Sequence, residues 1–546
     1  MMQEHKDRSR ISYYATLMVL ASLFAVLFYS ATWLTGDEAR YYVPAWSLAH
    51  GYGYTDAAMP GRPPETMTPP LQAFLISLII RSTDNPIALA KAVGSIWYIL
   101  YALLTAMLVR RLFSTRPGTA WAVSVMALFA LPILVVTPGL MADLPFMALV
   151  AFAFLLLHRA ESSRSPGWMF SVGMVASLAY LTRAVGLALV AGIALHLLLH
   201  RRWKELLWYL AGAVLLYAPW QIRNLLVATN AESYFSYASK VAGGSGVSDL
   251  PVMRLVRQFT IKFPPYLHSV LPSILFPHLI EGRNLLGILG LGFLAAPFRW
   301  GVAALVAVGF GLSLRRFSAM ELYWILTWVL ISIFPFPGFY PYYLFPMVFI
   351  AAIYVARSVG VLSDMATRGN RQRSTQVRGV ILGGMAAYVL AIALTSGVIH
   401  WRKEQPRRAY APTAPERYRF YLNDYYDAWS TFAEAAEWIR NHTPQNALVA
   451  SRKPGHYFVL SDRQGWRYDE PNRIGYSNAW DAVTGMGRDA PVYVVEDAFA
   501  GQGEHSTWYG ESRVHVLEPL LQEHADAFEL VFTSSKPSTR VWRYIP

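Results

Sequence analysis

The stretch that decides the fold is ISYYATLMVLASLFAVLFYSATWL, residues 11–34, which contains no charged side chain. An α-helix needs about 20 mainly apolar residues to cross the hydrocarbon core of a bilayer. The stretches 87–109 and 380–400 meet the same requirement, and shorter apolar runs occupy residues 119–137, 140–157, 167–181, 184–199, 206–220, 300–314, 319–335 and 340–356. These runs predict a polytopic α-helical membrane protein with about eleven transmembrane helices.

The composition agrees with this class. Of the 546 residues, 55% are hydrophobic and only 15% are charged, whereas soluble domains carry about 25% charge. The net charge of +13 raises the question of a nucleic-acid partner. Residues 1–400 hold 30 Lys and Arg against 15 Asp and Glu, while residues 401–546 hold 17 against 19. The positive excess therefore lies in the apolar part, where it reports membrane topology, and we expect no nucleic-acid partner.

The basic residues also orient the chain, because short cytoplasmic loops collect Lys and Arg. Three of them (Lys6, Arg8 and Arg10) precede the first span and predict a cytoplasmic N-terminus. Alternation of eleven spans then places every basic doublet on the same side: Arg110/Arg111, Arg201/Arg202 and Arg315/Arg316. A twelfth span at 285–297 would break this agreement, so that run is interpreted as interfacial or re-entrant. We expect a multi-pass protein of the plasma (inner) membrane.

This topology divides the chain into a transmembrane domain, residues 1–400, with outer loops at 35–85 and 223–299, and an extracytoplasmic domain, residues 401–546. In the first loop, a short helix is predicted from Asp37 to Gly51, because Asp suits the start of a helix and Gly its end. The Pro-rich apolar stretch 263–279 is predicted to lie at the membrane interface. The C-terminal segment is predicted to be soluble α/β, with helices at 430–441 and 514–527 and strands at 447–451, 491–496, 529–532 and 539–544.

Acidic residues at the outer face are the first candidates for chemistry. Asp37 and Glu38 come directly after the first span; their structural interpretation is a helix N-cap followed by an acid in the first turn. Asp143 lies three residues into the apolar span 140–157. An ionisable residue inside a span is costly and indicates a functional site, although Asp143 could also cap the start of its helix.

Two arginines are predicted at the same face. Arg183 lies between two apolar runs, and Arg223 ends the span 206–220. Either could extend to lipid phosphate. However, these arginines, the acids above and Glu65 come from separate elements and converge on one side of the membrane. Carboxylates beside arginines suit activation of a hydroxyl next to a phosphate leaving group.

Other polar and aromatic residues carry weaker signals. Glu321 falls at a cytoplasmic span end and is expected to be solvated or to extend to the interface. The stretch Phe339–Tyr343, which contains Tyr342 and Tyr343, is more typical of an interfacial aromatic belt, but it emerges on the outer face. The sequence has no Cys, and its 13 His residues show no HExxH spacing, so no metal site is predicted by motif.

Several of these residues occur within motifs of a known family. The pair in Gly36-Asp37-Glu38-Ala39-Arg40-Tyr41 resembles the outer-loop signature of GT-C glycosyltransferases, in the branch of the protein O-mannosyltransferases (dolichyl-phosphate-mannose–protein mannosyltransferases) and the lipid A aminoarabinose transferase. Similar motifs of that branch follow in the same order: Pro69-Pro70-Leu71, Ala142-Asp143-Leu144-Pro145, Leu181-Thr182-Arg183 with Gly186-Leu187, and Pro219-Trp220-x-x-Arg223-Asn224. The resemblance spans most of residues 10–360.

The chain departs from the family pattern in two places. Where the family often has Arg-Tyr-x-x-Pro, this sequence reads Tyr342-Tyr343-Leu344-Phe345-Pro346, so one phosphate-binding candidate is replaced. The lipid A transferase has Lys before its Pro-Pro, where Thr68 stands here. These departures leave the sugar and the acceptor open.

The resemblance implies an enzyme that moves one sugar from a polyprenyl-phosphate donor to a lipid, glycan or protein acceptor at the outer face of the membrane, with inversion. It implies Asp37 as the general base, with Glu38 and Asp143 in the catalytic group. Arg183 and Arg223 would stabilise the departing lipid phosphate, while Tyr41, Glu65, Tyr342 and Tyr343 would bind substrate. No cofactor is required, and a divalent cation stays open.

The alternative is a non-enzymatic membrane protein, such as a lipid-linked sugar flippase or an assembly partner. A transporter is expected to show paired inverted repeats and charges at the membrane midplane. The sequence shows neither feature, which favours the enzyme.

Overall fold

The computed structural model describes residues 2–29, 34, 37–137, 139–227, 251–277, 290–315, 317–333, 341–408, 427–497, 513–535 and 539–546. The chain forms two compact units. A helical unit contains residues 1–30, 90–223 and 238–405, and a second unit contains residues 31–89, 224–237 and 406–546. The first outer loop and the C-terminal segment, which lie far apart in the sequence, therefore fold together. The predicted domain boundary at residue 400 stays a prediction.

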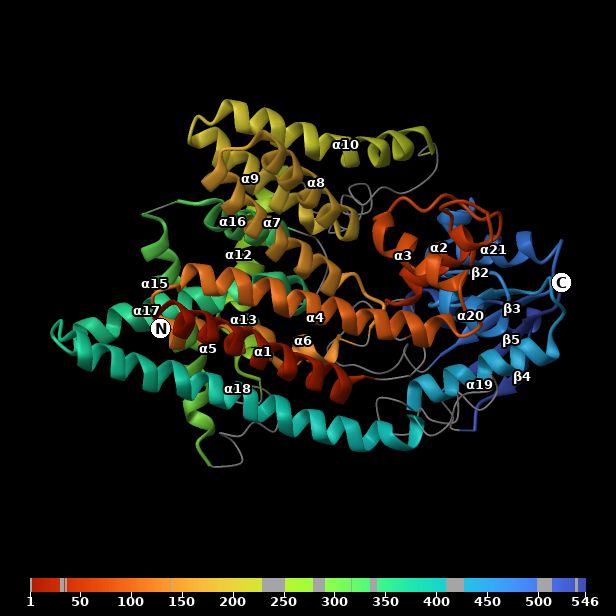
Figure 1. The fold of residues 1–546 in the computed structure, drawn as a ribbon. Coiled ribbons are helices and arrows are strands. Elements are labelled where there is room, and N and C mark those ends of the chain that lie inside the picture. Colours follow the sequence, from red (N-terminus) through yellow and green to blue (C-terminus); the bar gives the residue numbers. More distant parts are fainter. Residues whose placement is uncertain are drawn as a thin grey trace. The chain divides into compact units, whose positions relative to one another are not determined.

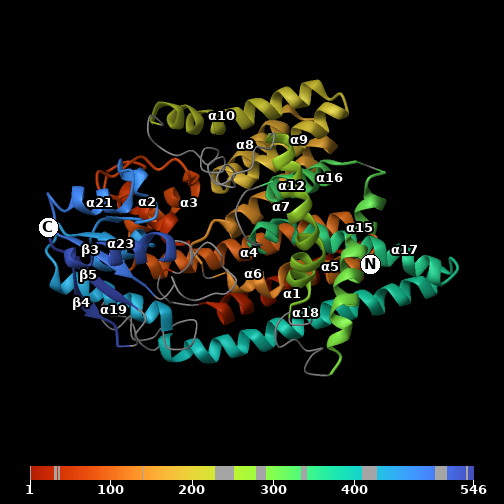
Figure 2. The same ribbon diagram turned by 180° about the vertical axis from the view of Figure 1, so that it is seen from behind.

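The helical unit is built from helices of unequal length (Figures 1 and 2). Its α-helices are α1 (Met2–Phe28), α4 (Pro86–Leu112), α5 (Pro117–Leu128), α6 (Leu131–Val135), α7 (Asp143–Ser163), α8 (Pro166–Thr182), α9 (Leu187–Leu199), α10 (Trp203–Val227), α12 (Pro251–Pro265), α13 (Leu271–Leu275), α15 (Ala295–Ser313), α16 (Ala319–Ile333), α17 (Val348–Ala366) and α18 (Arg371–Arg408). Short turns join some of them: η1 (Ala184–Gly186), η2 (Tyr266–Val270), η3 (Gly292–Leu294) and η4 (Pro341–Met347).

Each predicted span coincides with a helix. Within the described residues, seven helical stretches are long and apolar enough to cross a membrane: α1, α4, α7, α10, α15 with η3, α17 with η4, and α18. The predicted spans at 119–137, 167–181, 184–199 and 319–335 correspond to the shorter helices α5, α8, α9 and α16. The run 119–137 is interrupted because α5 ends at Leu128 and Pro132 lies in the first turn of α6, where its missing N–H costs no hydrogen bond.

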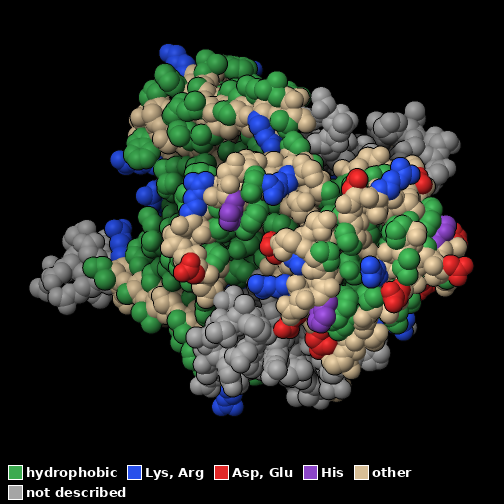
Figure 3. All heavy atoms as spheres, turned by 90° about the vertical axis from the view of Figure 1, so that its right-hand side faces the viewer, with side chains coloured by type: hydrophobic (Ala, Val, Ile, Leu, Met, Phe, Trp, Pro, Cys, Tyr) green, Lys and Arg blue, Asp and Glu red, His purple; other side chains and the backbone are tan. Residues whose placement is uncertain are grey.

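Burial separates core helices from peripheral ones. Most of α7 and of the η4–α17 stretch is buried within the protein, whereas α10 is mainly exposed and presents Leu207, Leu225 and Leu226 at its surface. A helix that is apolar on all sides belongs in a core or in lipid. Hydrophobic side chains accordingly dominate the α10 surface at the top of Figure 3. These features are those of a polytopic membrane protein.

Close helix contacts depend on glycine. A Cβ on Gly173 of α8 would lie 2.0 Å from the Tyr209 carbonyl oxygen, and one on Gly212 of α10 would lie 2.0 Å from that of Phe170. The two glycines thus allow the α8 and α10 backbones to touch, as small residues do between membrane helices.

Two predictions concern the second outer loop. The stretch 263–279 was expected at the membrane interface, but Tyr266, Leu271 and Ile274 are buried in the core of the helical unit. Its apolar side chains pack against other helices, and its depth in the membrane stays a prediction. The run 285–297, interpreted as interfacial or re-entrant, is described only from Gly290, and η3 begins at Gly292 and continues into α15 as one apolar stretch. Residues 278–289 lie outside the described residues.

The second unit contains a five-stranded mixed sheet with the order β2-β1-β3-β5-β4. Its strands are β1 (Leu448–Ala450), β2 (Gly465–Trp466), β3 (Val492–Glu496), β4 (Phe528–Thr533) and β5 (Arg540–Tyr544). Strands β2, β1 and β3 are parallel, and β5 pairs antiparallel with both β3 and β4. The four predicted strands are confirmed as β1, β3, β4 and β5, whereas the two-residue β2 is too short for its alternation to be recognised.

Helices cover both faces of this sheet. They are α19 (Asp427–His442), α20 (Pro454–Ser461), α21 (Ala479–Met486) and α23 (Glu518–Glu523), with short turns η6 (Pro471–Ile474), η8 (Arg513–Leu517) and η9 (Ala525–Ala527). Successive strand residues face opposite sides, so Tyr493 packs with α19 in one core while Val494 packs with α21 in the other. The helix predicted at 430–441 is confirmed as α19. The one predicted at 514–527 is divided among η8, α23 and η9.

The first outer loop folds against this domain. It contributes α2 (Ala39–Ala49) and α3 (Pro70–Ile80). The Gln464 side chain donates to the carbonyl oxygens of Ala57 (3.0 Å) and Met59 (3.1 Å), and the Gly465 N–H donates to that of Ala58 (2.7 Å). The α2 residue Trp46 packs edge-on against Phe458 of α20, with ring centroids 5.0 Å apart. The loop and the C-terminal domain therefore form one body.

Candidate functional site

In the helical unit, the candidate site begins with an ion pair. Asp143 is the first residue of α7 and is 2% exposed. Arg183 follows the last residue of α8 in an extended conformation, and its Nη1 donates to Asp143 Oδ1. A buried charge is costly unless it is paired. Asp143 therefore does more than begin its helix, because its carboxylate holds an arginine from the next helix.

The local sequence explains how Arg183 reaches this position. Helix α8 stops at Thr182, and the turn η1 folds the chain back on α8. A Cβ on Gly186 would lie 2.6 Å from both the N and the Cα of Tyr180, so only glycine fits this turn without a backbone shift. The element Leu181-Thr182-Arg183 with Gly186 thus forms a short interruption between α8 and α9, and Arg183 lies in that interruption.

Two tyrosines complete the arrangement. The guanidinium carbon of Arg183 lies 5.4 Å from the ring centroid of Tyr342 and 5.7 Å from that of Tyr343, both in η4. These distances are in the range of cation–π attraction. The structure therefore brings together four predicted residues, Asp143, Arg183, Tyr342 and Tyr343, which we call the Arg183 cluster. The two tyrosines are not merely an interfacial belt.

Arg223 lies in the last part of α10, where its guanidinium carbon is 5.3 Å from the Trp220 ring centroid. Gln221, two residues before Arg223, donates a hydrogen bond to the hydroxyl oxygen of Tyr180 at 2.8 Å. This hydrogen bond ties the end of α10 to α8. The motif Pro219-Trp220-x-x-Arg223 thus places its arginine on an aromatic ring beside a helix end fixed to its neighbour.

The second unit holds the other predicted residues. Asp37 is half-buried in the turn before α2, and Tyr41 lies in the first turn of that helix. The N-cap position belongs to Glu38, which is 3% exposed and makes no side-chain capping bond. The structural interpretation of Asp37 as an N-cap was therefore wrong.

Glu65 has a structural task within the same unit. Its Oε1 accepts hydrogen bonds from the backbone N–H groups of Met67 (2.7 Å) and Thr68 (2.8 Å). The Tyr54 hydroxyl donates to the Thr68 carbonyl oxygen at 2.8 Å. Glu65 thus shapes the chain that enters Pro69-Pro70 and α3. The sequence predicts a place for Glu65 in the outer loop but does not predict this backbone role.

Sequence reasoning missed two titratable groups beside these residues. Burial raises the pKa of Asp56 to about 6; Arg473 opposes this shift, while Glu65 adds to it. Burial lowers the pKa of Lys453 to about 8, and the nearby Asp37 carboxylate opposes that shift. A signal for Lys453 was present, because Arg452 and Lys453 directly follow a predicted strand of an α/β domain.

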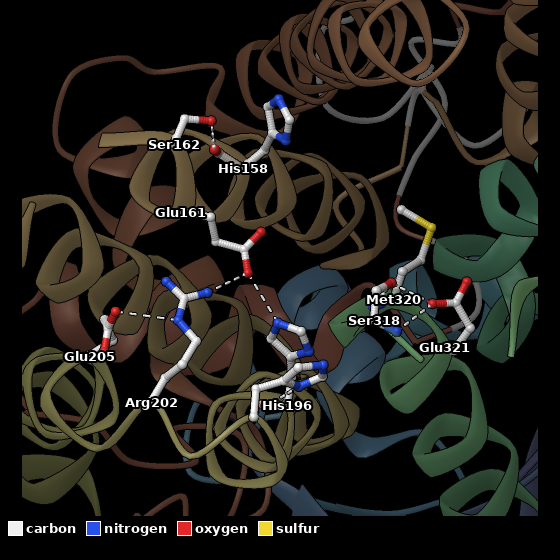
Figure 4. Close-up of polar contacts among 10 residues, drawn as sticks. His158, Glu161, Ser162, His196, Arg202, Glu205, Ser318, Met320 and Glu321 are labelled. Carbon is white, nitrogen blue, oxygen red and sulfur yellow. Dashed lines mark hydrogen bonds and ion pairs between the residues drawn. The ribbon is translucent and has the colours of Figure 1, made fainter. Parts of the chain in front are cut away.

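Away from these groups, Figure 4 shows a network among α7, α9 and α10. One oxygen of Glu161 lies 3.0 Å from His196 Nε2 and 2.8 Å from Arg202 Nη1. Glu205 accepts from Arg202 Nε at 3.3 Å. These contacts fasten three helix ends and explain why charged side chains are tolerated there.

The prediction for Glu321, which Figure 4 shows beside Ser318, needs correction. Glu321 is 2% exposed, accepts hydrogen bonds from both the backbone N–H and the hydroxyl of Ser318, and pairs with Arg357 at 3.5 Å. It was expected to be solvated or to extend to the interface, and this was wrong because α17 covers it. Among the described residues, no group of three His, Asp or Glu is arranged to hold a metal ion.

Residues 67–221 match the family model described as dolichyl-phosphate-mannose-protein mannosyltransferase. No match was found among the curated proteins. The apo structure of ArnT from Cupriavidus metallidurans is similar with a TM-score of 0.51 and 15% identity, over 98% of this chain and 98% of that chain.

A second similar structure is the Archaeoglobus fulgidus oligosaccharyltransferase tethered with an acceptor peptide. Its TM-score is 0.50 at 14% identity, over 98% of this chain and 74% of that chain. The family model describes a mannosyltransferase, and the second structure is an oligosaccharyltransferase. The resemblance to GT-C glycosyltransferases is thereby confirmed, and the fold extends over nearly the whole chain.

Proposed function

We propose that this membrane protein with the GT-C fold transfers a single sugar from a polyprenyl-phosphate donor to a hydroxyl of a lipid, glycan or protein acceptor at the outer face of the membrane, with inversion. The observation that carries the proposal is the Arg183 cluster. Two of its four residues, Asp143 and Arg183, lie in motifs that resemble those of the family and inside the segment that the family model matches.

The Arg183 cluster suits a phosphate group. A guanidinium presents its donors in a planar fork that fits phosphate oxygens. Asp143 fixes one end of that fork, and the rings of Tyr342 and Tyr343 lie near its carbon centre. An arginine held in this way requires little reorganisation when negative charge develops on the leaving lipid phosphate. We therefore assign donor phosphate binding to Arg183, with Asp143 as its positioning residue and Arg223 as a second cation.

The acceptor side is assigned to the second unit. Asp37 is the proposed general base: it takes the proton of the acceptor hydroxyl as that oxygen attacks the anomeric carbon and the bond to the donor phosphate breaks. Glu38 and Tyr41 closely follow Asp37 in the sequence and are proposed to shape the acceptor site. Glu65 maintains the backbone of the loop. Positive-inside alternation puts these residues, Arg183 and the C-terminal domain on the outer side. That side of the membrane is where the proposed transfer takes place.

The test uses purified protein in proteoliposomes and a panel of undecaprenyl-phosphate hexoses and pentoses. Arg183→Ala is expected to lower kcat/KM by about 100-fold or more, as for other charge-stabilising groups. The matched control is Arg159→Ala. Like Arg183, Arg159 lies near an aromatic ring, with its guanidinium carbon 6.0 Å from the Trp168 ring centroid, but it is near the other end of α7. Equal activity of Arg183→Ala and the wild type contradicts the assignment.

The alternative, a lipid-linked sugar flippase or assembly partner, makes a different prediction in the same vesicles. A flippase moves the labelled donor across the bilayer without an acceptor and releases no polyprenyl phosphate. The proposed transferase releases polyprenyl phosphate in proportion to the sugar transferred.

A further inference from the structure

Charged residues gather at one edge of the C-terminal sheet. Strands β2, β1 and β3 run parallel, so their carboxyl ends meet at the same edge. Arg452 and Lys453 follow β1 within three residues, Arg467 follows β2, and Asp497 follows β3. In open α/β sheets this edge is where ligands and reactive groups collect. The C-terminal domain therefore has a place suited to presenting a cation.

That edge lies against the start of α2. A Cβ on Gly455 would lie 3.5 Å from the Ala39 Cβ and 3.4 Å from Val43 Cγ2, both ordinary van der Waals contacts. Ala39 is two residues after Asp37, and Gly455 is two residues after Lys453. The first turns of α2 and α20 thus pack against each other, and the ammonium of Lys453 interacts electrostatically with the Asp37 carboxylate.

We propose that Lys453 is a positioning residue for Asp37, so that the C-terminal domain supplies the counter-charge that orients the general base of the acceptor site. This inference rests on the proposed function. It gives the domain a direct part in the reaction, because the carboxylate of Asp37 is held from a segment at the opposite end of the chain. Lys453 touches no reacting atom itself.

The backbone around Lys453 is well anchored. Lys453 is the N-cap residue of α20, and its carbonyl oxygen accepts hydrogen bonds from the N–H groups of His456 (3.0 Å) and Tyr457 (3.2 Å). Pro454 takes the first helical position, where its fixed φ suits the turn. Tyr457 is fully buried and packs on Phe432 of α19, with ring centroids 4.2 Å apart. The ammonium is therefore presented from a rigid base.

Other charged groups also act on Lys453. Asp497 favours its charged form, whereas Arg452 and Arg467 disfavour it. His456 is buried, and burial together with the charge of Lys453 lowers its pKa. Because Lys453 has a pKa of about 8, its charge is present below that pH and is lost above it. The activity that depends on an oriented Asp37 then falls through about pH 8.

The experiment compares transfer rates of the full-length protein between pH 6 and 10. Lys453→Gln is expected to lower kcat by about tenfold or more with little change in the KM for the donor, as loss of alignment does. Lys453→Arg keeps its charge and restores most of the activity, and it moves the alkaline limb of the profile above about pH 9. The matched control is Arg488→Gln, an exposed cation of the same unit.

Non-additivity provides a second readout. In the Asp37→Asn background, Lys453→Gln is expected to cost little further activity, because the group that it positions is already lost. Three results would each overturn the proposal. The first is a double variant in which the two losses of activity multiply, and the second is an alkaline limb of the pH profile that Lys453→Arg does not move. The third is a Lys453→Gln rate within about twofold of the wild type.

A third readout does not depend on catalysis. The apparent unfolding temperatures of wild type, Asp37→Asn, Lys453→Gln and the double variant form a cycle at pH 7 and at pH 9.5. A coupling between the two substitutions in unfolding temperature that is present at pH 7 and absent at pH 9.5 supports the pair. This holds even if the wild type transfers no sugar, and in that case only the proposed function fails. Absence of coupling at both pH values, measured on these folded variants, overturns the pairing itself.

Discussion

The Arg183 cluster and the proposed Asp37–Lys453 pair join opposite charges in different ways. Asp143 and Arg183 are 40 residues apart in one helical unit, and both are almost fully buried. Asp37 and Lys453 come from opposite ends of the chain, and both keep partial exposure. A dry, local pair fixes an arginine permanently, whereas a partly exposed pair between distant segments responds to pH. The first arrangement suits binding of a constant anion, and the second suits a base that exchanges protons.

The largest expected effect concerns Asp37. Asp37→Asn keeps the size of the side chain but removes its basicity, so kcat should fall by about 10²–10⁴, the usual contribution of a general base. The KM for the donor and the apparent unfolding temperature should stay near their wild-type values. The measurement is steady-state transfer together with thermal unfolding, and Asp84→Asn, an exposed acid of the same unit, is the control. Undiminished transfer would remove Asp37 from the reaction.

The second effect tests whether the Arg183 pair is as dry as its burial indicates. Removing one partner of a buried ion pair costs about 3–5 kcal/mol, whereas replacing both with apolar residues is often neutral. Arg183→Met should therefore lower the apparent unfolding temperature more than the double variant Arg183→Met with Asp143→Leu, although both are inactive.

The control for this comparison is Glu205→Gln, which removes one partner of the half-exposed Arg202–Glu205 pair. Exposed pairs contribute about 1 kcal/mol or less, so its unfolding temperature should barely change. If the double variant is less stable than Arg183→Met alone, the Arg183 pair does not behave as a buried one.

The two regions differ in how much of their structure can be predicted from the sequence, because one is built from local motifs and the other from a contact between distant segments. The Arg183 cluster lies in short motifs next to helix ends, where apolar length and a glycine turn define local structure. Lys453 was missed because its importance depends on the contact between α20 and α2, which no local pattern encodes. The prediction for Glu321 was wrong for the same reason, because α17 covers the end of the span in which Glu321 lies. The strands β1, β3, β4 and β5 were predictable from apolar runs, but their order in the sheet was not.

A smaller effect concerns the aromatic side of the Arg183 cluster. A cation–π contact contributes about 0.5–2 kcal/mol, depending on desolvation. Tyr342→Leu and Tyr343→Leu should each raise the KM for the donor by about two- to tenfold, and the corresponding Phe variants should retain most of the affinity because the ring remains. Donor titrations measure this, with Trp168→Leu under Arg159 as the matched control. Equal loss in the Phe and Leu variants would assign the effect to the hydroxyls instead.

The smallest effect lies in the second unit, at Asp56. Its pKa is about 6 in the folded protein against an ordinary value of 3.8, so the folded state binds a proton more tightly than the unfolded chain does. By linkage, the associated stability is fully present below about pH 4 and is lost as the pH rises through about 6. At pH 7 the ionised, buried carboxylate is a net cost.

Asp56→Asn should therefore raise the apparent unfolding temperature slightly at pH 7 and leave it unchanged near pH 4. The amide oxygen can still accept the backbone N–H of Ala58, which lies 3.2 Å from Asp56 Oδ1. The contrast with Asp143 is direct, because the Asp143 carboxylate has an arginine partner and its loss destabilises. If Asp56→Asn lowers the unfolding temperature at pH 7, the carboxylate of Asp56 is stabilised by a cation, and Arg473 is then the residue to replace next.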